Sequence, residues 1–135
     1  MNYRIGQGVD AHRLEQGRPL VLGGVSIPFE KGLVAHSDGD VLLHAVTDAL
    51  LGAGGLGDIG RHFPDTDDAF KDIDSRIMLR RAWQVLTERG WALGNIDATV
   101  IAQEPKLKDY LGQMIQCMAE DLGVEPGCIN IKATT

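Results

Sequence analysis

Residues 35–48 most strongly limit how this chain can fold, because they place two histidines and three carboxylates within fourteen residues. Ser37 is followed three residues later by Asp40, immediately before an apolar run, which is typical of a capping box at a helix N-terminus. The pattern predicts a helix over about 38–51, with His36 and Ser37 in the loop beside free backbone N–H groups. That end of a helix is a natural site for an anion such as phosphate. The alternative is an ordinary loop histidine beside a capping serine.

Three side chains at separate positions form a candidate metal site. Asp10 and His12 lie two residues apart in the segment 2–13, and if this segment is a strand, both side chains point to one face. His44 lies in the predicted helix, and Asp48, one turn further along, is predicted to orient the His44 ring. Three protein ligands with one open position is the arrangement of a catalytic zinc ion. The alternative is a solvated aspartate and a capped histidine that hold no metal.

The composition excludes several function classes. The chain has 135 residues, 44% hydrophobic and 24% charged, which is typical of one globular domain spanning residues 1–135. The net charge of −6 and the isoelectric point near 5.0 argue against broad binding to nucleic acid or to anionic membranes. The sequence has no apolar run long enough to span a bilayer and no N-terminal signal pattern, which predicts a cytoplasmic protein.

Hydrophobic periodicity predicts alternating strands and helices. The predicted strands lie at 2–13, 91–103 and 128–135, and a hairpin is predicted at 19–27 around Gly23-Gly24. Three helices are predicted. The first spans 38–51, the second begins at a cap at residue 74 or 75 and ends at 90, and the third spans 107–122. This order indicates an α/β fold (an α+β sandwich) with a mostly four-stranded mixed sheet, helices packed on one face and a small extra hairpin. The chain ends inside a predicted strand, so we expect that a C-terminal strand is missing.

The segment 56–68 is rich in Gly, Pro and Asp and is predicted to be a loop. Its residues Asp58, Asp65 and Asp67 either form turns or accept hydrogen bonds from the hydroxyls of a polyol. Thr134-Thr135 at the end of the last strand either binds phosphate or reflects ordinary strand propensity.

Several sequence blocks together resemble one enzyme family. They are Gly6-x-Gly8-x-Asp10-x-His12, Leu22-Gly23-Gly24-Val25-x-Ile27-Pro28, Ala35-His36-Ser37-Asp38-Gly39-Asp40-Val41-x-x-His44-Ala45-x-Thr47-Asp48-Ala49-Leu50-Leu51-Gly52, Gly57-Asp58-Ile59-Gly60 and Phe63-Pro64-Asp65-Thr66-Asp67. Across essentially the whole chain, this pattern closely resembles the 2-C-methyl-D-erythritol 2,4-cyclodiphosphate synthase family of the non-mevalonate isoprenoid pathway.

The resemblance implies a metal-dependent lyase that works as a homotrimer, with active sites between neighbouring subunits. The implied substrate is 4-diphosphocytidyl-2-C-methyl-D-erythritol 2-phosphate. Its 2-phosphate attacks the β-phosphorus of its own diphosphate, so that the cyclic diphosphate forms and cytidine monophosphate (CMP) leaves. Such an intramolecular transfer needs positioning and charge neutralisation more than a protein nucleophile.

The resemblance also implies roles for individual residues. Asp10, His12 and His44 would bind Zn²⁺, a substrate phosphate would take the open position, and Mg²⁺ or Mn²⁺ would bridge the diphosphate. His36 and Thr135 would stabilise the transition state. The residues that would contact the substrate are Asp10, His12, His36, Ser37, Asp58, Ile59, Gly60, Phe63, Pro64, Asp65, Thr66 and Asp67, and, from the neighbouring subunit, Ala102, Gln103, Glu104, Pro105, Lys106, Leu107, Lys108, Thr134 and Thr135.

Two further interpretations are compatible with the residues alone. The first is a zinc-dependent phosphoesterase, in which water takes the open metal position and attacks phosphorus. The second is a trimeric binding protein whose zinc is structural, in which case removing the metal should unfold it.

Overall fold

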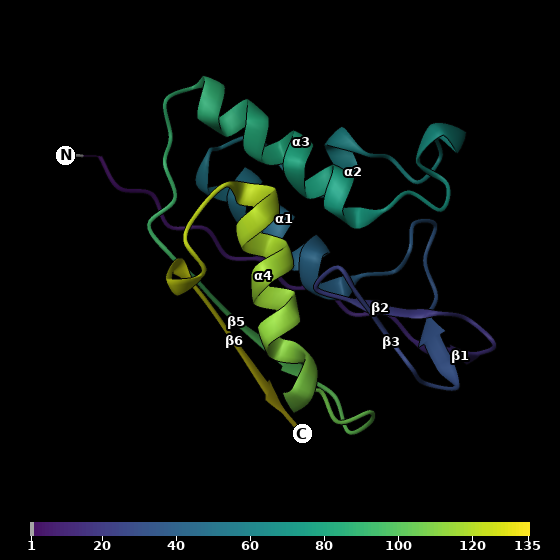
Figure 1. Ribbon diagram of the computed structural model, residues 1–135. Coiled ribbons are helices and arrows are strands. Elements are labelled where there is room, and N and C mark those ends of the chain that lie inside the picture. The colour runs from purple at the N-terminus through teal and green to yellow at the C-terminus, as the bar shows by residue number, and fades with distance from the viewer. Residues whose placement is uncertain (1) are drawn as a thin grey trace.

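Figure 1 shows the computed structural model, which describes residues 2–135. Its helices are α1 (Val41–Ala53), α2 (Ile59–His62), α3 (Ser75–Glu88) and α4 (Leu111–Leu122), with short 3-10 helices η1 (Asp68–Phe70), η2 (Lys108–Tyr110) and η3 (Pro126–Cys128). Its strands are β1 (Leu14–Gln16), β2 (Leu20–Leu22), β3 (Val25–Ile27), β4 (Lys31–Leu33), β5 (Ile96–Ile101) and β6 (Ile129–Thr134). None of the helices in this part of the chain is long and apolar enough to cross a membrane.

The strands β5 and β6 form a parallel pair that helices cover on one face. Val100, Ile129 and Ile131 are buried on the covered face, whereas Asp97 and Thr99 are exposed on the other. Helix α4 packs on β6 and α1 packs on β5, and Figure 1 shows α4 lying along the pair. The predicted mixed α/β class with helices on one face is therefore confirmed.

The hairpin of β2 and β3 forms where the glycine pair predicts it. Leu20 pairs with Ile27 across the ladder, and both side chains are buried. Gly23 and Gly24 turn the chain with φ angles of +60° and +78°. A two-residue turn with two positive φ angles needs residues without a Cβ, which explains why two glycines stand here.

The predicted strand over residues 2–13 is wrong, and so is the four-stranded sheet. The segment has no strand, and β1 begins only at Leu14, where it pairs with β4. Within residues 2–135, the strands pair in three separate two-stranded sheets. The alternating side chains of the segment misled the prediction, because the segment packs on a helix instead of a strand. Gly6 and Gly8 lie against the backbone of α1, and Tyr3 and Ile5 are exposed.

This close packing predicts that Gly8→Ala destabilises the protein. A Cβ at Gly8 would lie 1.9 Å from the carbonyl oxygen of Ala45, so the segment must move away from α1. We expect a loss of about 1–3 kcal/mol in the free energy of unfolding, measured with urea, because overpacking a tight contact costs that much. The control is Gly94→Ala, since no atom lies within 4 Å of its Cβ position. Equal stability of the two variants would contradict the prediction.

The three long helices begin and end close to their predicted positions. Helix α3 is capped by Asp74, whose carboxylate accepts the N–H of Arg76, and α4 ends at Gly123 in the left-handed conformation. The start of α1 differs, because Asp40 itself is the N-cap and accepts the N–H of Leu43 at 3.0 Å. The predicted capping box led by Ser37 is therefore wrong.

Asp40 also ties α1 to the β2–β3 hairpin. Its carboxylate is fully buried and accepts the backbone N–H groups of Gly23 at 2.9 Å and Gly24 at 2.8 Å. Burial raises the pKa of Asp40 from 3.8 to about 6, although its hydrogen bonds to the N–H groups of Leu43, Gly24 and Gly23 oppose the shift. One side chain thus connects the helix start to the turn.

The raised pKa of Asp40 predicts a pH dependence of stability. Above pH 3.8 and up to about 6, the folded protein holds a proton that the unfolded chain has lost. Stability therefore falls as the pH rises through this window, by up to about 3 kcal/mol. Asp40→Asn removes this contribution, so the difference in unfolding free energy between wild type and variant should shrink from about pH 4 to about pH 7. Urea titrations at both pH values measure it, and a constant or growing difference would contradict the assignment.

Candidate metal centre and adjoining pocket

Asp10, His12 and His44 come together although they lie far apart in the sequence. Oδ2 of Asp10 lies 3.2 Å from Nε2 of His12 and 3.0 Å from Nδ1 of His44. One potential ligand atom from each residue lies within 4.8 Å of the others. Asp10 and His12 come from the segment before β1, and His44 lies on α1. The contact of Gly8 with the helix backbone brings the two elements together.

The electrostatics of Asp10 suit a metal ligand. Partial burial raises the pKa of Asp10, but its hydrogen bond to His44 and the charge of His12 outweigh this, so the pKa lies below its ordinary value. The carboxylate is therefore ionised at neutral pH. One carboxylate oxygen and two imidazole nitrogens converge on one point, which fits a divalent metal with nitrogen and oxygen ligands.

The His44 ring is oriented by residues other than the predicted one. Its Nε2 lies 2.8 Å from Oγ of Ser75 and 3.1 Å from Oγ of Ser37. Asp48 instead accepts the backbone N–H of Ile59 at 2.7 Å, which fixes the start of α2. The prediction that Asp48 orients His44 is wrong. The loop after α1 folds back and places the N–H of Ile59 beside Asp48, and the Asp48 carboxylate accepts this hydrogen bond instead of one from His44.

A pocket of about 490 Å³ opens beside these three residues. Its lining residues are Asp10, His12, Ala35, His36, Ser37, His44, Asp48, Ile59, Gly60, Phe63, Pro64, Asp65, Thr66, Phe70, Ile73 and Met78. The pocket thus joins the loop before α1 to the segment 59–73. Ten of the residues predicted to bind substrate, from Asp10 to Thr66, line it.

One side-chain contact and one backbone hydrogen bond hold the segment 59–73 over the pocket. Nε2 of His36 lies 3.1 Å from the carbonyl oxygen of Asp67, and the N–H of Asp72 donates to the carbonyl oxygen of His36 at 2.7 Å. His36 is therefore a wall residue of the pocket and also an anchor for its loop.

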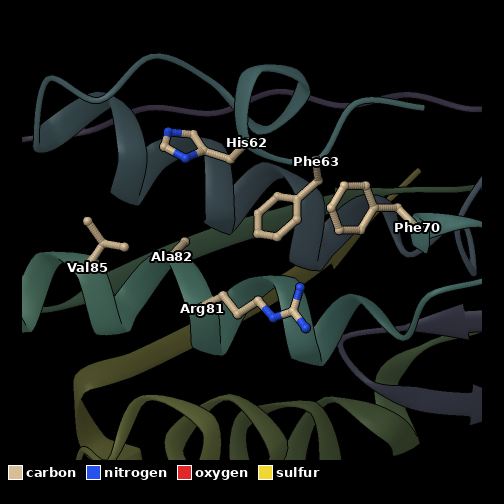
Figure 2. Close-up of a pocket in the computed structure, with 6 residues that line it drawn as sticks. All are labelled: His62, Phe63, Phe70, Arg81, Ala82 and Val85. Carbon is tan, nitrogen blue, oxygen red and sulfur yellow. The ribbon is translucent and has the colours of Figure 1, made fainter. Parts of the chain in front are cut away.

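The rings of Phe63 and Phe70 form a shared wall between this pocket and a smaller hollow of about 220 Å³. Their centroids lie 5.5 Å apart at an angle of 81°, which is an edge-to-face pair. Figure 2 shows the two rings above α3, with the Arg81 side chain beneath them and His62 to one side. This aromatic pair stiffens the loop that faces the metal ligands.

Some predicted site residues lie outside the pocket. Asp58 and Asp67 cap α2 and η1 by accepting the N–H groups of Arg61 and Ala69, and their contact with substrate stays a prediction. The segment 102–108 and Thr134-Thr135 do not line the pocket either. They lie together at the ends of β5 and β6, where the N–H of Ala102 donates to the carbonyl oxygen of Thr134 at 2.9 Å.

Sequence reasoning missed several residues of the site. Ser75 was recognised only as a helix cap and Asp38 only as part of the helix start, yet both lie next to His44 through hydrogen bonds. Phe70, Ile73 and Met78 complete the apolar side of the pocket. No spacing rule connects residues 38 and 75, because their contact depends on how the loop between them folds.

The fold and the site define a small α/β protein with a candidate His-His-Asp metal centre beside a pocket that has a polar and an apolar side. The profile of the YgbB family matches residues 3–135, and the chain belongs to this family.

Relatives and solved structures agree with this assignment. A protein of Neisseria gonorrhoeae named 2-C-methyl-D-erythritol 2,4-cyclodiphosphate synthase is 62% identical over 134 residues, covering 99% of this chain and 84% of the relative. One of the same name from Lysinibacillus sphaericus is 59% identical over 133 residues, covering 98% and 84%. A solved 2C-methyl-D-erythritol-2,4-cyclodiphosphate synthase in a CDP-bound form superimposes with a TM-score of 0.92 at 42% identity, covering 98% of this chain and 88% of that one.

Proposed function

We propose that this protein is a 2-C-methyl-D-erythritol 2,4-cyclodiphosphate synthase, a lyase of isoprenoid precursor biosynthesis. It converts 4-diphosphocytidyl-2-C-methyl-D-erythritol 2-phosphate to 2-C-methyl-D-erythritol 2,4-cyclodiphosphate and CMP. The observation that carries the proposal is the His-His-Asp triad in the wall of a pocket whose other polar residues suit phosphates and hydroxyls. Relatives with this name at about 60% identity support it.

The reaction needs no protein nucleophile. An oxygen of the 2-phosphate forms a bond to the β-phosphorus while the bond from that phosphorus to the bridging oxygen of CMP breaks. Both reacting groups belong to one molecule, so the pocket has to hold them in line and offset their negative charge. The donors of the loop before α1, His36 and Ser37, face the pocket and suit this role. Gly60, Asp65 and Thr66 on the opposite side suit the erythritol hydroxyls.

Asp10, His12 and His44 would hold Zn²⁺, and a second divalent ion, Mg²⁺ or Mn²⁺, would accompany the diphosphate of the substrate. When bound, these ions act as Lewis acids that offset the charge of the reacting phosphates. The chain's own contribution is the ionised Asp10, the two imidazoles and a pocket shaped to keep the tethered phosphate near them. The donor set of nitrogens and one oxygen favours zinc over calcium.

We also propose a homotrimer in which a neighbouring subunit completes the site. The segment 102–108 and Thr134-Thr135, proposed to bind the cytidine diphosphate, lie away from the pocket of their own chain. Three large apolar side chains of this chain are exposed to solvent: Tyr3 is 81% exposed, Ile5 is 95% exposed and Ile101 is 75% exposed. Burial against another copy would remove this apolar surface from water, which supports the proposal. In this arrangement Thr135 acts with the His36 of a neighbouring copy on the transition state.

Turnover in ¹⁸O-labelled water tests the proposed reaction. Ring closure uses only oxygen atoms of the substrate, so mass spectrometry should find no label in CMP or in the cyclic product. Label in either phosphate product would establish water as the nucleophile and a phosphoesterase as the correct function. Sedimentation of the same sample tests the trimer separately, and a monomer at micromolar concentration would contradict it.

A further inference from the structure

A chain of hydrogen bonds connects the candidate metal ligand His44 to Asp38. Nε2 of His44 lies 2.8 Å from Oγ of Ser75. Oγ of Ser75 in turn lies 2.5 Å from Oδ1 of Asp38, whose Oδ2 accepts the backbone N–H of Ser75 at 2.9 Å. Ser75 is fully buried and His44 is 8% exposed, so water does not replace these partners.

The donors around Asp38 determine which way the Ser75 proton points. Oδ1 of Asp38 also accepts the backbone N–H of Asp40 at 3.0 Å, so three donors converge on this one carboxylate. A carboxylate in this position accepts and does not donate, so the hydroxyl proton of Ser75 points to Asp38. Oγ of Ser75 then offers His44 only lone pairs. Nε2 of His44 has two hydroxyl neighbours, Ser75 at 2.8 Å and Ser37 at 3.1 Å, and with the proton on Nε2 it donates to the nearer one, Ser75.

When a metal takes the place of the hydrogen bond between Nδ1 of His44 and Asp10, Nδ1 is therefore the ring nitrogen that offers its lone pair. Nδ1 is the atom that faces Asp10, at 3.0 Å from Oδ2, beside Nε2 of His12. A neutral imidazole bound to a metal offers a lone pair on one nitrogen and keeps its proton on the other. The hydrogen bond to Ser75 and metal binding through Nδ1 therefore both need the same tautomer of His44, the one with its proton on Nε2.

We propose that Asp38 and Ser75 are positioning residues that fix the Nε2–H tautomer of His44 and so prepare Nδ1 to bind the metal. This inference rests on the proposed function, since it presumes that the triad holds zinc. It also links the metal to the pocket loop, because Ser75 is the first residue of α3 and the N–H of Asp38 donates to the carbonyl oxygen of Ile73 at 3.2 Å. The loop and the metal ligand are then ordered by the same two side chains.

Zinc affinity is the readout that tests the proposal without turnover. Competition with a chromophoric chelator should show that Ser75→Ala and Asp38→Asn each bind zinc about 10–100-fold more weakly than wild type, the usual effect of losing such a partner. The hydroxyl and the N–H of Ser75 donate to different oxygens of Asp38, and Asp38→Asn replaces one of these oxygens by an NH₂ group that cannot accept. The control is Thr47→Val, which removes another buried hydroxyl from α1, one that donates to the carbonyl oxygen of Leu43 at 2.7 Å. Its zinc affinity should equal that of wild type.

Proton-detected NMR with ¹⁵N-labelled histidine reports the tautomer directly. In zinc-loaded wild type, the proton of His44 should lie on Nε2 and exchange slowly with water, and in Ser75→Ala it should exchange faster. Coordination through Nε2, a rapidly exchanging Nε2 proton in wild type, or unchanged zinc affinity in folded variants would each overturn the proposal. If both variants fail to fold by circular dichroism, the wild-type spectrum alone decides. Wild type that binds no zinc at all would instead refute the proposed metal function.

Discussion

Replacing His44 by alanine is expected to remove zinc and to lower the rate of CMP release by about 10³-fold or more. A metal that neutralises phosphate charge supplies several kcal/mol to the transition state, and each 1.4 kcal/mol or so corresponds to a tenfold change in rate. His44 is buried, and its Nδ1 lies 3.0 Å from Asp10, so no neighbouring side chain can take its place. Metal analysis of the purified variant and a CMP-release assay measure both effects.

His62→Ala is the matched control for this result. His62 is exposed, and its Nε2 contacts the carbonyl oxygen of Leu56 at 2.8 Å, outside the metal triad. Its loss should leave zinc content and rate close to the wild-type values. If His44→Ala retained full zinc and activity, or if His62→Ala lost as much, the triad would not be the metal site.

The largest effect on stability is expected from Asp121→Ala, at about 3 kcal/mol or more of unfolding free energy. The Asp121 carboxylate is 2% exposed and joins α4 to α3 by accepting from Nε of Arg76 at 2.8 Å and Nη1 of Arg80 at 2.7 Å. The hydrogen bonds that Arg76 donates to Asp121 are the main reason why the pKa of Arg76 is raised, despite partial burial. Removing one partner of a buried pair leaves the other charge uncompensated, at a cost of about 3–5 kcal/mol. Because Arg76 is partly exposed, we expect the lower end.

Urea unfolding of the variant beside Asp97→Ala measures this effect. Asp97 also forms an ion pair, with Lys132 at 3.0 Å, but both side chains are about half exposed. Solvent screens such a pair, so its loss should hardly change the unfolding midpoint. If Asp121→Ala and Asp97→Ala lowered the free energy of unfolding by similar amounts, burial of the Asp121 ion pairs would add nothing to stability.

Helical periodicity and end signals were sufficient to predict the three long helices α1, α3 and α4, but not the short α2. The apolar stripe ending at Gly123 and the cap at Asp74 depend only on neighbours along the chain, and both occur where predicted. The N-terminal segment was mispredicted because alternation alone does not reveal a partner. Gly6 and Gly8 look like strand glycines, but they allow the segment to lie on the backbone of α1.

The metal triad was predictable because its residue types are unusual for their places in the sequence, above all His44 in an apolar helix. The network behind it was not, since Asp38 and Ser75 meet through a loop whose path no local rule gives. The same limit applies to the aspartates of that loop. Asp58 and Asp67 cap helices while Asp65 lines the pocket, although all three have similar sequence surroundings.

Phosphorus NMR of the products tests the central claim most directly. The protein is incubated with 4-diphosphocytidyl-2-C-methyl-D-erythritol 2-phosphate, Zn²⁺ and Mg²⁺, and the phosphorus signals are followed over time. The proposed function predicts equal amounts of the cyclic diphosphate and CMP, which disappear when zinc is chelated while the fold remains intact. Linear phosphate products, or an unchanged substrate with zinc bound at the triad, would contradict it.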